Sequence, residues 1–280
     1  MITPNNKNLN SGLFTLYLPC FALLLYLVTA VWSVQYDDIT TDEWDDLNYG
    51  IQVLKLNTSR YTDNESDFRS TMPVTAINAI PRAVEQILHP GLQKNDWGET
   101  DIRNGRYMTI LLTLGLLFYC FLFGKTLAGA GGGAIAMLLV ATDPNILAHS
   151  RLVTKDIYGT LGFIATFYHL YQWLLNKKKN HFLYCCIAIA VANCCKVNNV
   201  ILYPLSFIAV AGYKLSGWNK KLLRPWGIKF LIFVLVQLFI INLFFLFHKT
   251  GMSLSAYHFK SSFFIDLQHS WPANIPLPLP

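Results

Sequence analysis

Charged residues are scarce in this chain. Only 14% of its 280 residues are Asp, Glu, Lys or Arg, whereas 53% are hydrophobic. A soluble domain of this length would carry roughly a quarter charged residues, so the composition excludes an ordinary soluble globular protein. Apolar stretches of about 20 residues, the length that crosses a bilayer as a helix, recur along the sequence instead.

Several kinds of motif are absent as well. The sequence has no Walker loop, no Rossmann fingerprint, no H-E-x-x-H and no G-x-S-x-G, which argues against the chemistry that each of them supports. The six cysteines lie in or beside apolar runs without zinc-ligand spacing, so we interpret them as small buried hydrophobic residues. The net charge of +6 does not indicate nucleic acid as a partner, because the basic residues cluster in short gaps between apolar runs.

Acidic residues are missing from one whole set of loops. The runs that we expect to span the membrane cover residues 13–32, 107–123, 134–147, 157–175, 182–195, 200–213 and 230–247. With the N-terminus inside and the spans alternating, the inner side receives ten basic and no acidic residues, and the outer side receives all sixteen acidic ones. This distribution obeys the positive-inside rule, and the reverse orientation would violate it.

We therefore expect an all-α polytopic membrane protein with about seven transmembrane helices, forming a single domain over residues 1–280 that could be truncated at its C-terminus. Its parts would be a signal-anchor helix (13–32), a large extracytoplasmic loop with short surface helices (34–106), a helical bundle (107–247) and an extracytoplasmic tail (248–280). The first run is too long for the apolar core of a cleaved signal peptide, and no A-x-A-like site follows it.

The acidic segment 41–46, TDEWDD, lies shortly after the first expected span. Thr41 can cap a helix whose first turn is acidic. The apolar residues after it suit an amphipathic helix lying on the membrane surface. A solvated, well-capped helix start would also explain these acidic residues. The position at the membrane surface, however, favours a functional role for Asp42 and Glu43.

A second charged segment, 143–156, joins two expected spans on the same outer side. It places two carboxylates, an imidazole and two cations at membrane depth, where ionisable groups are costly and usually functional. If its last residues are helical, Arg151 and Lys155 share a face, and a cationic pair beside Asp156 suits an anionic group such as a phosphate. The alternative is that these charges only satisfy one another.

Lys196 separates two short apolar runs. From the outer side it could touch an anionic headgroup. As a residue at a helix end it could equally extend its amine to the interface without a specific role.

Together these motifs resemble a known family. A signal-anchor helix, an outer loop that opens with Asp42-Glu43, a Gly-rich turn between two spans, the run from Ala148 to Asp156, and Cys195-Lys196 are similar to the membrane glycosyltransferases of the GT-C superfold. Within that group the chain resembles the branch of protein O-mannosyltransferases and lipid A aminoarabinose transferases. The resemblance covers about residues 13–213.

The resemblance implies transfer of a sugar from a polyprenyl-phosphate donor to an extracytoplasmic acceptor, which could be a protein, a lipid or a glycan. By motif, Asp42 and Glu43 would be catalytic, and one reacting carboxylate with direct displacement implies inversion at the sugar. The residues that would surround the donor phosphate are His149, Arg151, Lys155, Asp156 and Lys196. No cofactor is implied with certainty, although Asp42 and Asp156 could hold a divalent metal.

The resemblance also implies a multi-pass protein with its active site on the extracytoplasmic face, and we favour the bacterial inner membrane over the endoplasmic reticulum. Two alternatives stay open. A transporter or flippase of lipid-linked or anionic solutes would use the same charges as a permeation path, and an inactive, truncated paralogue would keep the fold alone. The long acidic outer loop and the lack of an inverted repeat argue against the transporter.

Overall fold

Most of the described residues of the chain are helical. A computed structural model describes residues 7–58, 72–91, 98–215, 223–256, 262, 265–266 and 275–279. Within these ranges there is no β-strand, and one isolated bridge joins Ser253 to Pro276. The expected all-α membrane fold is confirmed.

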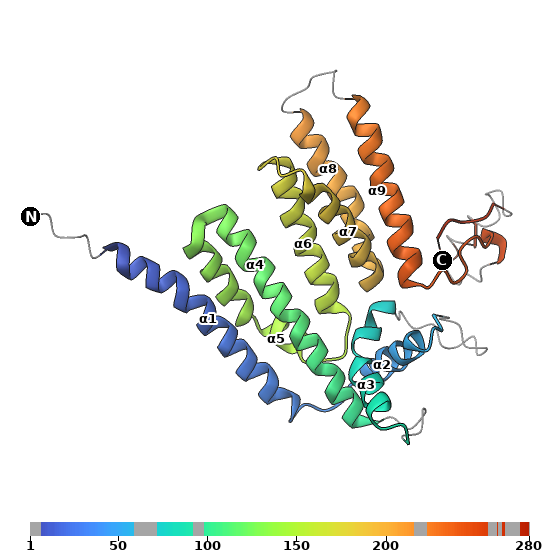
Figure 1. Cartoon of the computed structure of the whole chain (residues 1–280), viewed down its shortest axis with the longest axis horizontal. Helices are drawn as coiled ribbons and strands as arrows, with labels where there is room; N and C mark the ends of the chain where they lie inside the picture. Colours follow the sequence, from blue (N-terminus) through green and yellow to red (C-terminus); the bar gives the residue numbers. More distant parts are fainter. Residues whose placement is uncertain are drawn as a thin grey trace, which may run out of the picture.

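Apolar helices packed side by side form the bundle (Figure 1). They are α1 (Lys7–Val34), α4 (Glu99–Ala141), α6 (Asp156–Leu174), α7 (Asn180–Cys195), α8 (Leu202–Leu215) and α9 (Leu223–Phe244). In the described part of the chain, α1, α4 and α9 are long and apolar enough to cross a membrane, and α7 and α8 are shorter apolar helices. α1 packs on α4, and α6 contacts both α4 and α7.

α4 is a helical hairpin. Ala128 and Gly129 have non-helical dihedral angles, and Gly129 has a φ of +73° that favours glycine. The two arms of α4 lie against each other, because a Cβ atom built on Gly133 would approach the carbonyl oxygen of Phe121 to 2.7 Å. The predicted Gly-rich turn between two spans is therefore present in the fold.

The second arm of the hairpin is shorter than the predicted span 134–147. It ends at Ala141, and Asp143 caps a separate helix, α5 (Pro144–Ser150). The Asp143 Oδ1 atom accepts hydrogen bonds from the backbone N–H groups of Asn145 and Ile146, both at 2.9 Å. A side-chain cap of this kind starts a new helix, which is why the span stops before the charged segment.

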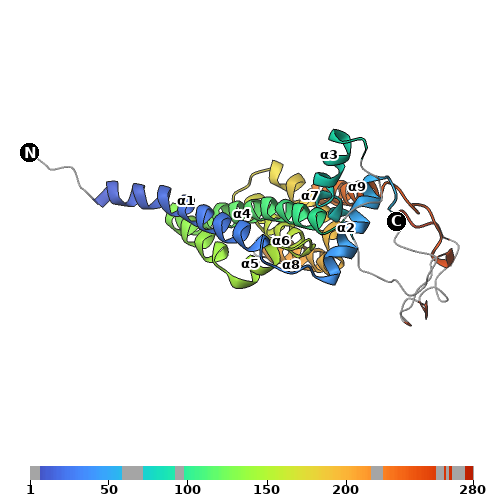
Figure 2. The same cartoon turned by 90° about the horizontal axis from the view of Figure 1, so that it is seen from below.

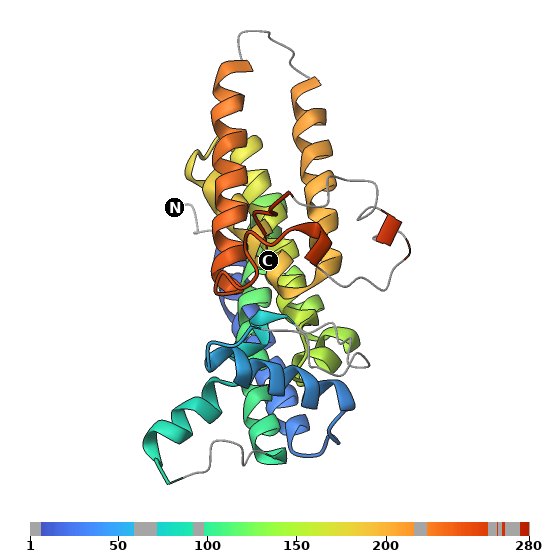
Figure 3. The same cartoon turned by 90° about the vertical axis from the view of Figure 1, so that its right-hand side faces the viewer.

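The short helices of the large loop lie across one end of the bundle, here called the loop end (Figures 1 and 3). They are α2 (Thr41–Leu54), the 3₁₀ helix η1 (Pro73–Ile77) and α3 (Ile80–Leu88). The sequence suggested that the apolar residues of 41–54 face the membrane surface, but in α2 two of them pack inside the protein. Leu47 and Ile51 are buried in a core with Ala79, Ile102 and Val153, so the apolar face of α2 packs on protein.

α3 carries the exposed apolar face instead. It projects from the side of the bundle (Figure 2), and Ile80, Val84, Ile87 and Leu88, which share a helix face, are exposed. The opposite side is anchored, since Arg82 is buried and lies 3.7 Å from Asp101 at the start of α4.

Candidate functional site

Glu43 and Arg106 form a fully buried ion pair at the loop end. The Arg106 Nε atom donates to Glu43 Oε1, and its Nη2 atom donates to Oε2, both at 2.8 Å. Neither side chain is exposed to solvent. The pair joins the first turn of α2 to the first arm of α4.

Every direction around the Glu43 carboxylate is occupied. Oε1 also accepts the backbone N–H of Val153 at 2.9 Å, and Oε2 accepts that of Thr40 at 3.0 Å. Thr40, not the predicted Thr41, is the N-cap of α2. Burial would raise the pKa of Glu43, but Arg106 and the two N–H donors outweigh it and leave the pKa below its ordinary value. Glu43 is thus an ionised group held in place.

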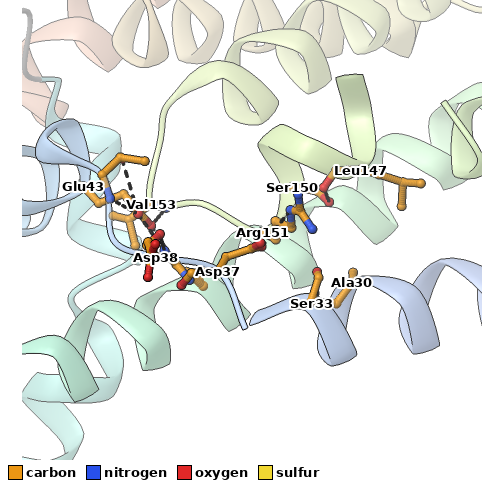
Figure 4. Close-up of polar contacts among 11 residues, drawn as sticks. Ala30, Ser33, Asp37, Asp38, Glu43, Leu147, Ser150, Arg151 and Val153 are labelled. Carbon is orange, nitrogen blue, oxygen red and sulfur yellow. Dashed lines mark hydrogen bonds and ion pairs between the residues drawn. The ribbon is translucent and has the colours of Figure 1, made fainter. Parts of the chain in front are cut away.

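The same guanidinium orders the chain between α1 and α2. Arg106 donates to the carbonyl oxygens of Asp37 at 3.0 Å and Asp38 at 2.8 Å. Figure 4 shows Asp37, Asp38, Glu43 and Val153 gathered there, with Arg151 reaching toward Asp37. Through Glu43, Arg106 therefore fixes both the segment before α2 and the charged segment before α6.

Asp46 pairs with Lys155 one helical turn after Asp42. The Lys155 Nζ atom lies 2.7 and 2.8 Å from the two carboxylate oxygens of Asp46, which is almost completely buried. Burial raises the pKa of Asp46; Lys155 offsets part of this effect, and the nearby charges of Asp42 and Asp156 add to it. These contacts place three carboxylates and one lysine in one electrostatic neighbourhood.

Asp156 is the first residue of α6 and is shared by two basic side chains. Its Oδ1 atom accepts a hydrogen bond from the Lys196 ammonium, and its Oδ2 atom lies 3.3 Å from His149 Nδ1. All three side chains are partly exposed. The structure thus brings together the predicted residues from three separate segments.

Arg151 and Lys155 do not share a helix face, because the chain from 151 to 155 is not helical. Arg151 Nε lies 2.9 Å from Asp37 Oδ2, whereas Lys155 turns to Asp46. Asp42 is exposed on the first turn of α2, on the same face as Asp46. Asp42 is therefore the most accessible of the predicted carboxylates. The charged residues gathered at the loop end are called the charged cluster below: Asp42, Asp46, His149, Arg151, Lys155, Asp156 and Lys196.

An apolar groove of about 480 Å³ runs along α6. Its lining on α6 extends from Tyr158 to His169, about 16 Å of helix. At the loop end it is bounded by Val74 of η1, by Tyr158 and by Cys195. Tyr158 follows Asp156 by two residues and Lys196 follows Cys195, so the charged cluster lies close to the groove's loop end, although none of its residues lines the groove.

The sequence interpretation missed Asp46 and Arg106. Asp46 was part of the acidic segment 41–46, and its spacing of four from Asp42 on a helix could have singled it out. Arg106 had the signal of a cation directly before the apolar run 107–123. Its partner lies 63 residues away, and no local spacing reveals such a contact.

A divalent metal stays a prediction. Among the residues that the structure describes, no three His, Cys, Asp or Glu side chains converge in a way that could hold an ion. Asp156, one of the two predicted ligands, already has Lys196 and His149 as partners.

The family model described as dolichyl-phosphate-mannose-protein mannosyltransferase matches residues 98–245, more than half of the chain. The chain belongs to this family. It is therefore an integral membrane glycosyltransferase that uses a polyprenyl-phosphate-linked sugar. The match includes every predicted donor-site residue but not Asp42 or Glu43, whose roles stay predictions. No similar curated protein and no similar solved structure was found.

Proposed function

We propose that this mannosyltransferase family member transfers a sugar at the charged cluster, with Asp42 as the general base. Asp42 removes the proton of an acceptor hydroxyl while that oxygen attacks the anomeric carbon. The bond from that carbon to the donor's phosphate oxygen breaks, and polyprenyl phosphate leaves with the electron pair. One direct displacement inverts the sugar.

Asp42 is chosen as the base because its carboxylate is exposed. Glu43 is enclosed by Arg106 and two backbone donors, and Asp46 is buried under Lys155. Asp42 is the exposed member of the three and can reach an acceptor. We assign Glu43 a positioning role, because it ties the segment that carries Lys155 to the helix that carries Asp42.

The departing phosphate needs positive charge, and the cluster supplies it. Arg151, Lys155 and Lys196 each have a carboxylate partner and remain partly exposed. A preorganised cation stabilises charge that develops on a leaving group, and a lipid phosphate can compete for these donors by charge-assisted hydrogen bonds. Asp156 and His149 would hold Lys196 ready between turnovers.

The observation that carries the proposal is the apolar groove whose loop end lies close to the charged cluster. A polyprenyl-phosphate donor has an apolar chain and an anionic head, and this arrangement offers a place for each. The loops expected on the other side of the membrane contain no acidic residue, and this distribution supports an extracytoplasmic position for the cluster. The acceptor would be a protein, a lipid or a glycan on that side.

Transfer of a labelled sugar from polyprenyl-phosphate mannose, with membranes carrying the chain, tests this proposal. We expect Asp42→Asn to lower the rate about 10²–10⁴-fold, the range for loss of a general base. Asp143→Asn is the matched control, since it neutralises another carboxylate of the segment 143–156 but still caps a helix. Full activity in Asp42→Asn would reject the base, and transport of the donor without transfer by the wild type would favour a flippase.

A further inference from the structure

A second apolar groove, of about 550 Å³, lies between α6, α7, α8 and α9. Its volume is within the range of about 300–1,000 Å³ of small-molecule sites. It lies toward the end of the bundle opposite the charged cluster, where α6 ends and the lysine run 177–179 follows. This end is called the lysine end, and Figure 3 shows α8 and α9 standing apart there.

The groove is open on one side and closed toward the middle of the bundle. Phe207 of α8 and Phe230 of α9 line it and are also largely exposed, so its mouth faces outward between these helices. Its inner end is closed by the Tyr203 and Phe233 rings, 5.9 Å apart. Tyr203 also donates to Gln237 at 3.1 Å.

Among the described residues that line the groove, Lys229 is the one cation, and it lies at the lysine end. The Lys229 ammonium lies 5.6 Å from the Trp173 ring and 5.2 Å from the Trp226 ring, and all three residues line the groove. Cation–π contacts at these distances hold an ammonium in place. Tryptophan and lysine at one level are also typical of the boundary between the apolar core of a bilayer and its headgroups.

The protein offers no anion to this cation from the helices that form the groove. The sequence has no acidic residue between Asp156 and Asp266, and Asp156 lies at the loop end. Ser206 also lines the groove, and its buried Oγ atom has no hydrogen-bond partner among the described residues. A positive charge at the mouth of an apolar groove matches a ligand with an apolar chain and an anionic head.

We propose that this groove binds an anionic phospholipid of the leaflet at the lysine end. One acyl chain lies between α8 and α9, and the phosphate accepts hydrogen bonds from Lys229. This site is distinct from the groove beside the charged cluster, with which it shares no lining residue. The lipid would fill the space between α9 and the rest of the bundle and stabilise their packing.

Native mass spectrometry of the full chain in detergent tests the site, with phosphatidylglycerol and phosphatidylcholine of identical acyl chains as probes. We expect one tightly retained phosphatidylglycerol. Phosphatidylcholine should bind at least about tenfold more weakly, because its choline ammonium neutralises the headgroup and competes with Lys229 for the phosphate. Lys229→Gln should remove the preference, and Val210→Trp should exclude both lipids. Lys125→Gln is the matched control, because its ammonium also faces a ring, Phe121 at 5.9 Å, outside the groove.

Equal retention of the two lipids by the wild type would overturn the proposal, as would a loss in Lys125→Gln equal to that in Lys229→Gln. Preferential retention of added polyprenyl phosphate, or a second copy of the chain in place of lipid, would also overturn it. Thermal unfolding of each variant shows whether it is folded. If Val210→Trp does not fold, the headgroup preference of the wild type and its loss in Lys229→Gln decide the question.

Discussion

At the scale of single residues, the loop end separates charges that hold the fold from charges that can react. Glu43 and Arg106 saturate each other in a fully buried pair, whereas Asp42 and Lys196 reach solvent. Asp46 and Lys155 lie between these extremes, buried but paired across two segments. Adjacent residues of the acidic segment thus have different tasks, which follow from their partners rather than from their residue type.

Arg106→Leu leaves the Glu43 carboxylate buried without its cation. Breaking a buried ion pair in this way costs about 3–5 kcal/mol, so we expect a correspondingly lower free energy of unfolding. Chemical or thermal unfolding in detergent measures it. The double variant Glu43→Leu, Arg106→Leu should recover much of the loss, and a loss equal to that of the single variant would argue against the pair.

The pH dependence of transfer should reflect Asp46. Because its pKa is raised, Asp46 takes up a proton at a higher pH than an ordinary aspartate, which titrates at about 3.9. As pH falls, the Asp46–Lys155 pair is therefore lost above that value, and transfer should decline with it. In Asp46→Asn this acid limb should be absent and the rate lower throughout. An unchanged limb in the variant would assign it to another group.

At the scale of elements, α6 and α7 line two separate apolar grooves, and α3 adds an apolar surface at the loop end. A bilayer accounts for such surfaces outside the bundle, since an amphipathic helix lies with its apolar face in the interface. The groove near the charged cluster can be tested as the site of the prenyl chain, and the apolar face of α3 can be tested for contact with the bilayer.

Ile187→Trp should obstruct the groove beside the charged cluster, since Ile187 lines it and is partly exposed. We expect KM for a long-chain polyprenyl donor to rise while the value for a short-chain donor stays near that of the wild type. Ile208→Trp, at an exposed apolar position of α8 outside both grooves, serves as the control. An equal effect on both chain lengths would place the prenyl chain elsewhere.

α3 should lie on the bilayer surface. A polarity-sensitive fluorophore on Ile87→Cys, in a Cys20→Ser background, should report an apolar environment in vesicles and lose intensity with brominated lipids. The control is Asn48→Cys on α2, which is exposed but lies outside the apolar face of α3. A response at Ile87→Cys as weak as that at Asn48→Cys would show that the apolar face of α3 is in water.

At the scale of the whole molecule, the sequence predicted the helices better than their contacts. The all-α membrane fold and the charged loop end could be predicted from the apolar runs, the Gly-rich turn and the restriction of acidic residues to the loops of one side. The pairing of Glu43 with Arg106 and of Asp46 with Lys155 joins residues 63 and 109 positions apart, and only tertiary packing sets such pairs. For the same reason, the apolar residues of α2 could not be assigned to protein or membrane in advance.

The central claim is that the charged cluster binds the donor's phosphate and that Asp42 drives the chemical step. Single-turnover transfer from preloaded polyprenyl-phosphate mannose tests it most directly. The account predicts that Asp42→Asn binds the donor as the wild type does but transfers its sugar about 10²–10⁴-fold more slowly, and that Lys196→Gln weakens donor binding. Transfer from bound donor at the wild-type rate in Asp42→Asn would contradict it.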